Sequence, residues 1–332
     1  MAIECKLPAE ILKPGSVTLP AKKLDEIVNK APGVEINLTI DKNQLTKITS
    51  DRSKFQINGV SSDEFPKMVN SLKKEEQFSV NQEDFLRAIS LTSFAASRFE
   101  TTSILSGVNL EVDGKQFEIG ATDGSRLARY ISNLQGTPKK SQGELVKKSL
   151  VIPGRALVEL ERLITSFKEG NDTVYFYLMP GQIIFQNNDF TLSTRLIDGT
   201  FPTYDKLIPK DQPYKVIFSR TSLLSSLERV AVLANERTNV VKLTFKKGSN
   251  TVKLTSNSPD YGDATDEVDL EYSGEDMEIA FNYRYLSEVL RNLEPETLTL
   301  ELEGPLSPLV LKTHDKVDYN YTYLIMPVQL RS

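Results

Sequence analysis

The fold is decided by a short stretch that occurs three times along the chain: VTLPAKKL at 17–24, LVIPGRAL at 150–157 and IAFNYRYL at 279–286. In each copy a short apolar run ends at proline or asparagine, and a leucine follows four residues later. Proline suits the first turn of a helix because the N–H that it lacks would be unbonded there, and asparagine caps the same N–H groups with its side chain. The stretch therefore predicts a strand followed at once by a helix. The proline or asparagine recurs after 133 and then 129 positions, so the chain repeats with a nearly constant period.

A second pair of strand-to-helix junctions interleaves with these copies, FSVN at 78–81 and VIFS at 216–219, with asparagine and serine in the capping position. Apolar residues at helical spacing follow all five junctions, and alternating stretches typical of antiparallel strands lie between the helices. The predicted fold class is therefore α+β, built from repeated strand–helix–strands modules. Two modules make a domain, which divides the chain into a partial domain with one helix, 1–72, and two further domains, 75–205 and 213–332.

Composition places the chain among globular proteins. Apolar residues make up 39% and charged residues 26% of the sequence, which excludes a disordered chain. No apolar run approaches the roughly 20 residues that span a bilayer, and the first ten residues do not read as a signal peptide. Cys5 is the only cysteine, so no internal disulfide can form, which favours a reducing cytoplasm. The net charge of −5 argues mildly against nucleic acid as a partner, unless the bases gather on one surface.

Residues that carry catalysis are scarce. The only histidine, His314, lies in a polar stretch, and with a single cysteine it makes neither a zinc site nor a nucleophile–histidine pair of ordinary composition. There is no glycine-rich phosphate-binding loop. The Asp123-Gly124 pair is typical of a turn, and the acids of 260–269 lack the ligand spacing of a calcium loop. We therefore predict no catalytic residues, no metal and no cofactor, and keep a hydrolase with a carboxylate pair only as a weak alternative.

Four motifs in register with the repeat carry a family resemblance: ATDGSRLA at 121–128, FPTY at 201–204, YSGEDMEI at 272–279 and YLIMPVQL at 323–330. Together they are similar to the bacterial DNA polymerase III beta subunit, the sliding clamp, and the resemblance covers essentially the whole chain. About the first 50 residues of the family pattern, with its first helix, have no counterpart, and a partial first domain buries less core and leaves a sheet edge open. We therefore expect weaker ring closure or an altered assembly.

The resemblance implies the architecture and the function. The sheets would lie outside and the helices would line a ring, closed by a head-to-tail homodimer. Such a subunit is a non-catalytic processivity factor: it encircles duplex DNA of any sequence and tethers the replicative polymerase, the clamp loader and repair proteins in the bacterial cytoplasm, at the nucleoid. Ser125 stands where the family commonly has histidine, and Gln329 where it often has arginine. A β-rich repeat protein that binds a partner without encircling DNA remains the alternative.

The family binds partner peptides in an apolar groove between its second and third domains. The tail of this chain suits such a groove: Leu324–Val328 is an apolar run near the chain end, Pro327 confines it to a sheet edge, and methionine adapts to varied ligands. A final edge strand that completes the core is the alternative. By resemblance, the groove residues are Leu105, Thr122, Gly124, Arg126, Leu127, Pro202, Lys206, Leu207, Asn282, Tyr285, Leu306, Pro308, Leu324, Ile325, Met326, Pro327 and Val328.

The polar faces of the predicted helices all carry lysine or arginine, whereas acids fall mainly on strands and loops. A lining of long basic side chains would meet phosphates and slide, because base contacts worth roughly 1–3 kcal/mol each would act as brakes. Ordinary solvated helix faces are the alternative. The predicted DNA-facing residues are Lys22, Lys23, Lys30, Arg87, Arg98, Arg155, Arg162, Arg220, Arg229, Arg284 and Arg291. By resemblance, the subunit contact joins Phe55 and Ile57 to Val232 and Leu233, for which plain core positions are the alternative.

Overall fold

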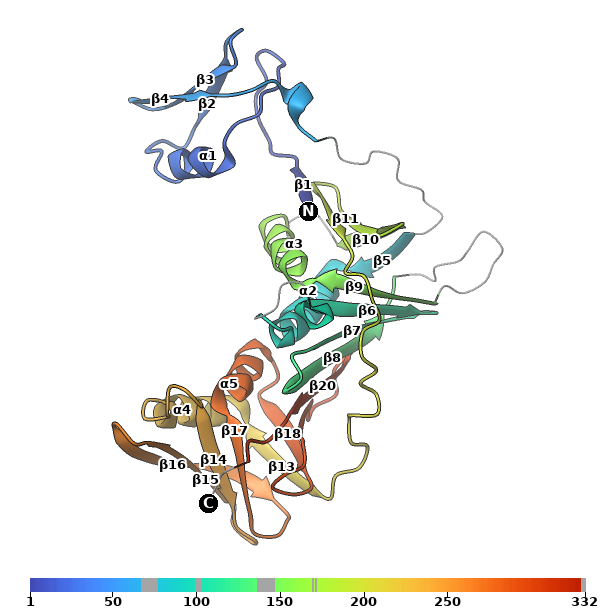
Figure 1. Cartoon of the computed structure of the whole chain (residues 1–332), viewed down its shortest axis with the longest axis vertical. Helices are drawn as coiled ribbons and strands as arrows, with labels where there is room; N and C mark the ends of the chain where they lie inside the picture. Colours follow the sequence, from blue (N-terminus) through green and yellow to red (C-terminus); the bar gives the residue numbers. More distant parts are fainter. Residues whose placement is uncertain (67–76, 99–102, 136–146, 169, 171, 330–332) are drawn as a thin grey trace. The chain divides into compact units, whose positions relative to one another are not determined.

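The computed structural model describes residues 1–66, 77–98, 103–135, 147–168, 170 and 172–329 (Figure 1). The chain divides into two compact units. The larger consists of Met1–Cys5 and Lys73–Ser332, and the smaller of Lys6–Leu72. The predicted boundary between 72 and 75 lies outside the described residues, and the division into three domains stays a prediction.

The larger unit holds four of the predicted helices: α2 (Gln82–Thr92), α3 (Gly154–Ser166), α4 (Arg220–Ala231) and α5 (Tyr283–Asn292). Asn81, Ser219 and Asn282 stand in the capping position, and their side chains accept hydrogen bonds from backbone N–H groups of the first turns. Proline precedes α3 and makes no such bond. A strand runs directly into a helix at four of the five predicted junctions, those of α2, α3, α4 and α5. At the fifth, residues 17–20, the prediction of a strand is wrong: Thr18 forms only an isolated bridge to Val60 before α1 (Ala21–Val28) begins.

Two antiparallel sheets complete the larger unit. The strands are β1 (Ala2–Cys5), β5 (Gln77–Asn81), β6 (Gly107–Asp113), β7 (Gln116–Thr122), β8 (Arg126–Asn133), β9 (Lys147–Pro153), β10 (Thr173–Met179), β11 (Gln182–Gln186), β12 (Phe190–Arg195), β13 (Tyr214–Ser219), β14 (Val240–Phe245), β15 (Thr251–Ser258), β16 (Gly262–Tyr272), β17 (Met277–Asn282), β18 (Thr297–Leu302), β19 (Leu309–Thr313) and β20 (Asn320–Ile325). One sheet has the order β1-β12-β11-β10-β5, and the other the order β17-β14-β15-β16-β13-β18-β19-β20-β8-β7-β6-β9.

The helices of this unit pack in pairs on one side of the strands, α2 against α3 and α4 against α5 (Figure 1). Their apolar faces share one core with the inward side chains of the strands. Phe85 of α2 lies among Phe176 and Phe185 of β10 and β11, with ring centroids 4.7 and 6.0 Å away. Such aromatic packing buries large apolar area and fixes the helix on the sheet.

The sheets continue from one module to the next through the same strand, the third one after a helix. The third strand after α2 is β8, and it pairs with β20, the third strand after α5. The third strand after α3 is β12, and it pairs with β1, whose residues Ala2–Cys5 lie opposite Phe190–Ser193. The internal repeat therefore fixes which strand edges join neighbouring modules.

The smaller unit contains α1 (Ala21–Val28) and a three-stranded antiparallel sheet of order β2-β3-β4, with β2 (Asn37–Ile40), β3 (Leu45–Ser50) and β4 (Ser53–Asn58). A single turn of 3₁₀ helix, η1, spans Ser62–Glu64. Ile48 of β3 is fully buried, whereas none of the residues of α1, all of which are described, is buried. This unit corresponds to one module, in agreement with the single helix expected before residue 72.

Candidate functional site

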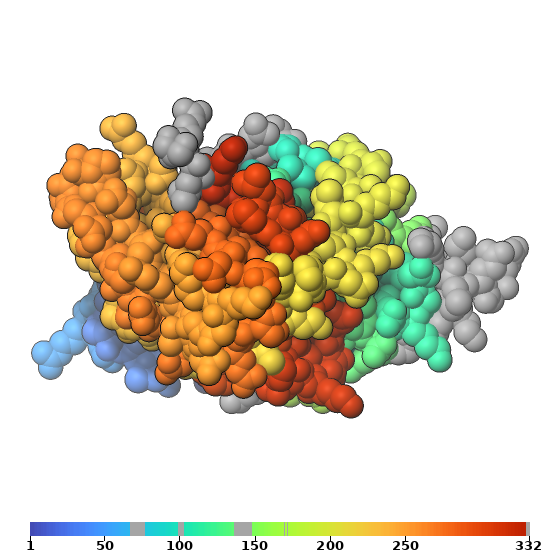
Figure 2. All heavy atoms as spheres, turned by 90° about the horizontal axis from the view of Figure 1, so that it is seen from below, coloured from blue at the N-terminus to red at the C-terminus, as the bar shows by residue number. Residues whose placement is uncertain are grey.

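A small apolar cluster, separate from the main core, lies where the second and third predicted domains meet. Leu127 of β8 and Leu324 of β20 are opposite each other across the strand pair. Both are buried, and with them pack Val151, Phe201, Tyr204 and Val310, while Ile104, Leu105, Ile197 and Ile208 cover the edges. Figure 2 shows the segment near residue 200 (yellow) lying against the C-terminal strands (red). We call these ten residues the junction cluster.

Four exposed apolar side chains lie within a few residues of junction-cluster members in the sequence. Leu207 is 62% exposed, Leu306 65%, Met326 42% and Val328 36%. The backbone N–H of Met326 donates to Ser125, and that of Val328 donates to Ala280, so the tail is held against both domains. Apolar surface beside a buried apolar cluster is typical of a binding surface.

The turn between β7 and β8 is held by its own side chains. Oδ1 of Asp123 accepts the N–H groups of Ser125 and Arg126 at 3.0 and 3.2 Å, and Oγ1 of Thr122 accepts that of Gly124 at 3.1 Å. Gly124 has a φ of +89°, which side chains rarely adopt, so glycine is needed here. The Asp-Gly pair is thus a turn, and it places Thr122 and Gly124 beside the tail at Met326.

Arg126 differs from the prediction that it lines the groove, because its side chain is only 5% exposed. Its Nε donates to Asp123 at 2.9 Å, one Nη donates to Glu288 of α5, and the other donates to the carbonyl of Phe94 at 2.7 Å. Burial lowers the pKa of Arg126, but the nearby Tyr323, Glu288 and Asp123 outweigh burial, and the pKa is raised. The guanidinium therefore stays charged, with all three nitrogens used.

The other predicted groove residues fall into three groups. Leu105, Leu127 and Leu324 belong to the junction cluster, while Pro202 and Lys206 are exposed and Thr122, Pro308, Tyr285 and Pro327 are partly buried. Asn282 caps α5. Ile325 is fully buried in the main core and differs from the prediction, because β20 alternates and its odd-numbered residues face the helices.

Sequence reasoning missed seven members of the junction cluster: Ile104, Val151, Ile197, Phe201, Tyr204, Ile208 and Val310. Of the FPTY motif at 201–204, only Pro202 belongs to the predicted groove. The hydroxyl of Tyr204 donates to Glu118 at 2.7 Å, which anchors the connecting segment to β7. The aromatic pair Phe201 and Tyr204, with centroids 6.1 Å apart, was the signal that could have revealed the cluster floor.

The predicted DNA-facing bases differ in their exposure and in whether they form ion pairs within the protein. Several are exposed but paired to carboxylates: Lys23 to Glu26, Arg162 to Glu159, Arg229 to Asp266 and Arg291 to Glu228. Arg87, which lies over the Tyr319 ring, and Arg220 are partly buried. Four have no ion pair to another described residue, and we call them the unpaired cations: Lys22, Lys30, Arg155 and Arg284.

Two of these bases do not lie on the helices to which they were assigned. Lys30 follows the end of α1, and Arg98 lies beyond the 3₁₀ turn η3 (Ser93–Ala95) that continues α2. In both cases the periodic pattern ran past the physical end of the helix. Arg98 instead lies 3.5 Å from Glu288.

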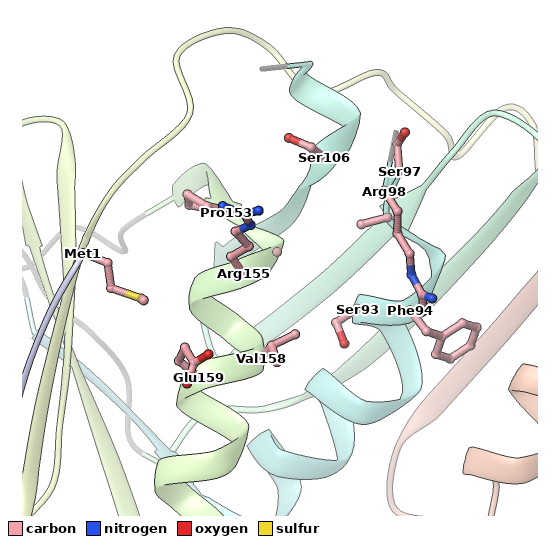
Figure 3. A pocket seen from close by; sticks show the side chains of 12 residues that line it. Met1, Ser93, Phe94, Ser97, Arg98, Ser106, Pro153, Arg155, Val158 and Glu159 are labelled. Atoms are coloured by element: carbon pink, nitrogen blue, oxygen red, sulfur yellow. The ribbon is translucent and has the colours of Figure 1, made fainter. Parts of the chain in front are cut away.

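A cavity of about 630 Å³ lies between α3 and the segment after α2 (Figure 3). Arg155, Val158 and Glu159 line it from α3, while Phe94 and Arg98 line it from the other side. It brings together two of the predicted DNA-facing bases.

The predicted subunit-contact residues fall in both compact units, and all four are at least partly exposed. Phe55 and Ile57 are half-buried in β4, which pairs only with β3 among the described strands. Val232 follows α4 and is 78% exposed, and the adjacent Leu233 is half-buried. Val232 is therefore not a core residue.

Neither a metal-binding cluster nor a membrane-spanning helix is found among the described residues. They contain no group of three or more histidine, cysteine, aspartate or glutamate residues arranged to hold a metal ion. None of their helices is long and apolar enough to cross a membrane.

Three family models match the chain in succession: the N-terminal domain of the DNA polymerase III beta subunit over residues 1–69, the central domain over 79–203 and the C-terminal domain over 205–329. The chain belongs to the DNA polymerase III beta subunit family. Members of this family are beta sliding clamps, non-catalytic processivity factors that encircle DNA and bind the polymerase, so neither the hydrolase nor the non-encircling repeat protein is favoured.

Individual clamps are similar over nearly the whole chain. The beta sliding clamp of Synechococcus elongatus is 35% identical over all of this chain and 86% of its own length. The crystal structure of the Bacillus subtilis clamp is 29% identical, with a TM-score of 0.84 over 99% of this chain and 86% of that one. A Pseudomonas aeruginosa clamp solved bound to griselimycin is 30% identical, with a TM-score of 0.83 over 96% and 82%. The resemblance and the fold class inferred from the sequence motifs are confirmed.

Proposed function

We propose that this clamp encircles duplex DNA and holds partner proteins by short apolar peptides that dock on the junction cluster. The single observation that carries the peptide site is the junction cluster itself with its exposed apolar neighbours Leu207, Leu306, Met326 and Val328. The cluster floor comes from β8, β9, β19 and β20, strands of different modules, and from the connecting segment between β12 and β13. Because this floor is already packed, a peptide would meet a formed surface and lose little affinity to reorganisation.

The peptide should carry large apolar side chains. The described rim is aliphatic, and methionine at 326 can adapt to several ligand shapes. Lys206 on the connecting segment is exposed and adds a positive charge beside the floor. We infer a ligand with leucine and aromatic anchors, taken from polymerase, clamp-loader or repair subunits.

Fluorescence anisotropy tests this site directly. A labelled peptide with a glutamine followed by leucines and a phenylalanine is titrated with the wild-type chain and with Met326→Asp. We expect saturable binding by the wild type and loss of binding in the variant, whose thermal unfolding should stay close to the wild type because residue 326 is partly exposed. Equal binding by both proteins would contradict the assignment.

The DNA-facing surface is proposed to consist of the bases on and beside the helices, with the unpaired cations as the main phosphate contacts. Contacts to phosphate carry no sequence information, so the clamp can move along the duplex. Loader-assisted protein should therefore remain on nicked circular DNA and leave it after linearisation. Equal retention on both templates would contradict encirclement.

Ring closure is proposed to follow the strand rule of the fold. The third strands after α2 and α5 pair with each other, and so do β12 and β1. Two third strands do not pair with another third strand: β4, which follows α1, and β16, which follows α4. Residues 262–269 of β16 pair only with β15 among the described strands. We infer that β4 of one subunit pairs with β16 of another, a head-to-tail contact that closes by rotation.

Charge supports this pairing. The open part of β16 carries Asp263, Asp266, Glu267 and Asp269, whereas β4 and the neighbouring turn carry Lys54 and Arg52. Opposite charges on facing strands favour the contact and disfavour β16 pairing with itself. The proposed location is the bacterial cytoplasm, at the nucleoid, which fractionation of cells would test.

A further inference from the structure

Strand pairing in the larger unit follows a second rule, in which two modules exchange strand contacts beside their paired helices. β6, the first strand after α2, pairs with β9, which precedes α3, and β10, the first strand after α3, pairs with β5, which precedes α2. The same exchange joins α4 and α5, because β14 pairs with β17 and β18 pairs with β13. Each of these modules is therefore completed by a second module, through two strand pairs and one helix pair.

The smaller unit has one module, and the strand segments that this rule uses lie open. β2, the first strand after α1, pairs only with β3 among the described strands, and all four of its residues are exposed. In the segment before α1, Thr18 directs its N–H and carbonyl to Val60 through an isolated bridge. Because neighbouring residues of an extended segment point their backbone groups in opposite directions, those of Val17 and Leu19 point away from Val60. Both segments therefore offer backbone donors and acceptors to a further strand.

α1 carries its apolar residues on one face, and that face is not covered. Leu24, Ile27 and Val28 are three and four positions apart, none of them is buried, and Val28 is 44% exposed. Leu38 and Ile40 alternate along β2 and are exposed as well. In the larger unit, the apolar faces of all four helices lie in the core. The smaller unit thus presents an apolar helix face and an apolar strand that a second module would bury.

Charge favours a second copy of this chain as the occupant. Neither of the two open strand segments carries a charged side chain, and charged side chains are what commonly prevents edge strands from pairing. Two copies related by a twofold axis would place their α1 helices antiparallel. A crossing at Leu24 then brings the two lysines before it on each helix opposite the two acids after it on the other. Lys22, one of the unpaired cations, would gain a carboxylate partner in this way.

We propose that the smaller unit is a self-association surface, which the smaller unit of a second copy completes. Residues 17–20 of each copy extend the β2 edge of the other, and the two α1 helices pack together. This contact is isologous and uses the β2 edge, whereas the proposed ring contact is head-to-tail and uses the opposite edge, β4. It also explains why 17–20 is not a strand in the single chain, since one bridge does not supply the ladder that holds a strand.

Cysteine cross-linking tests the helix contact in the full chain. Leu24→Cys and Asn43→Cys are each combined with Cys5→Ser, so that each protein has one thiol, and mild oxidation is followed on non-reducing gels. Residues at a twofold crossing of packed helices approach the Cα separation of roughly 5–6 Å that a disulfide needs, so Leu24→Cys should form covalent dimers. Asn43 is exposed in the turn between β2 and β3, and its variant should stay monomeric. Equal yields from the two variants, or no dimer from Leu24→Cys, would overturn the proposal.

Sedimentation in the Val232→Asp background separates this contact from ring closure. With the proposed β4–β16 contact weakened, the chain should still dimerise, and Val28→Asp should raise the Kd of that dimer roughly tenfold or more, because each copy would bury a carboxylate. Asn43→Asp adds the same charge outside the helix face and should leave the Kd unchanged. A monomer at micromolar concentration, or equal effects of the two charges, would overturn self-association through α1. An unchanged association in Val232→Asp alone would instead count against the ring contact.

Discussion

Truncation of Leu207 to alanine tests the peptide site with a magnitude that follows from the structure. The change removes three carbons, and each carbon that becomes buried contributes ~0.8 kcal/mol. Leu207 is 62% exposed in the free protein, so that part of its surface is available for a peptide to cover. The expected loss is about 1.5 kcal/mol, or roughly a tenfold rise in the Kd of the peptide.

The matched control is Leu38→Ala in β2 of the smaller unit. Leu38 is 58% exposed and is not a member of the junction cluster, so the same chemical change is made at nearly the same exposure in the other compact unit. We expect anisotropy titrations to give a tenfold weaker Kd for Leu207→Ala and an unchanged Kd for Leu38→Ala. A change of less than twofold in Leu207→Ala, or equal changes in both variants, would refute the assignment of Leu207 to the peptide site.

Four further predictions concern assembly, packing, pH and salt. Val232→Asp should weaken the dimer, measured by sedimentation, because it places a charge in the proposed subunit contact; an unchanged association constant would contradict that contact. Leu127→Ala should lower the free energy of unfolding by ~2–5 kcal/mol in denaturant titrations, because it leaves a cavity in the junction cluster. Hydrogen bonds from Ser219 and Thr221 lower the pKa of Glu296, so its stabilisation exists at neutral pH and is lost as the pH falls through the lowered pKa; Glu296→Gln should reduce the melting temperature at neutral pH, and the difference from the wild type should shrink as the solution is made more acidic. Finally, if only the four unpaired cations of each chain meet phosphate, the logarithm of the DNA association constant should fall with that of salt with a slope of about −4 per subunit, and a slope near −10 would mean that the paired bases also take part.

The sequence was sufficient for features that depend on neighbouring residues. The starts of α2, α4 and α5 were predicted because a capping side chain bonds N–H groups two or three residues ahead. The repeat added the module order, since each helix is followed by three strands. Helix ends were less accurate, as the misassigned Lys30 and Arg98 illustrate, because no comparable signal marks the C-terminal turn.

Features that depend on distant residues could not be predicted in the same way. Arg126 is separated from Glu288 by 162 positions, and their pairing offsets the free-energy cost of burying a charged side chain. Ile325 looks like its neighbour Leu324, yet the strand register sends one into the main core and the other into the junction cluster. Strand register and the choice of interaction partner depend on the tertiary structure. The family resemblance indicated which positions belong to the groove, but not whether their side chains are exposed or buried.

The charge distribution explains how an acidic chain can serve on DNA. Arg229 pairs with Asp266 at 2.6 Å and Arg291 with Glu228 at 2.8 Å, so part of the basic surface is neutralised by the protein itself. Such exposed pairs contribute little to stability, and a phosphate can compete for the guanidinium. Weak, partly satisfied contacts are what a sliding surface needs, because a strong uncompensated contact would hold one position on the duplex. In the proposed ring, the net charge of −5 would limit nonspecific adhesion, while the helix bases would meet phosphate.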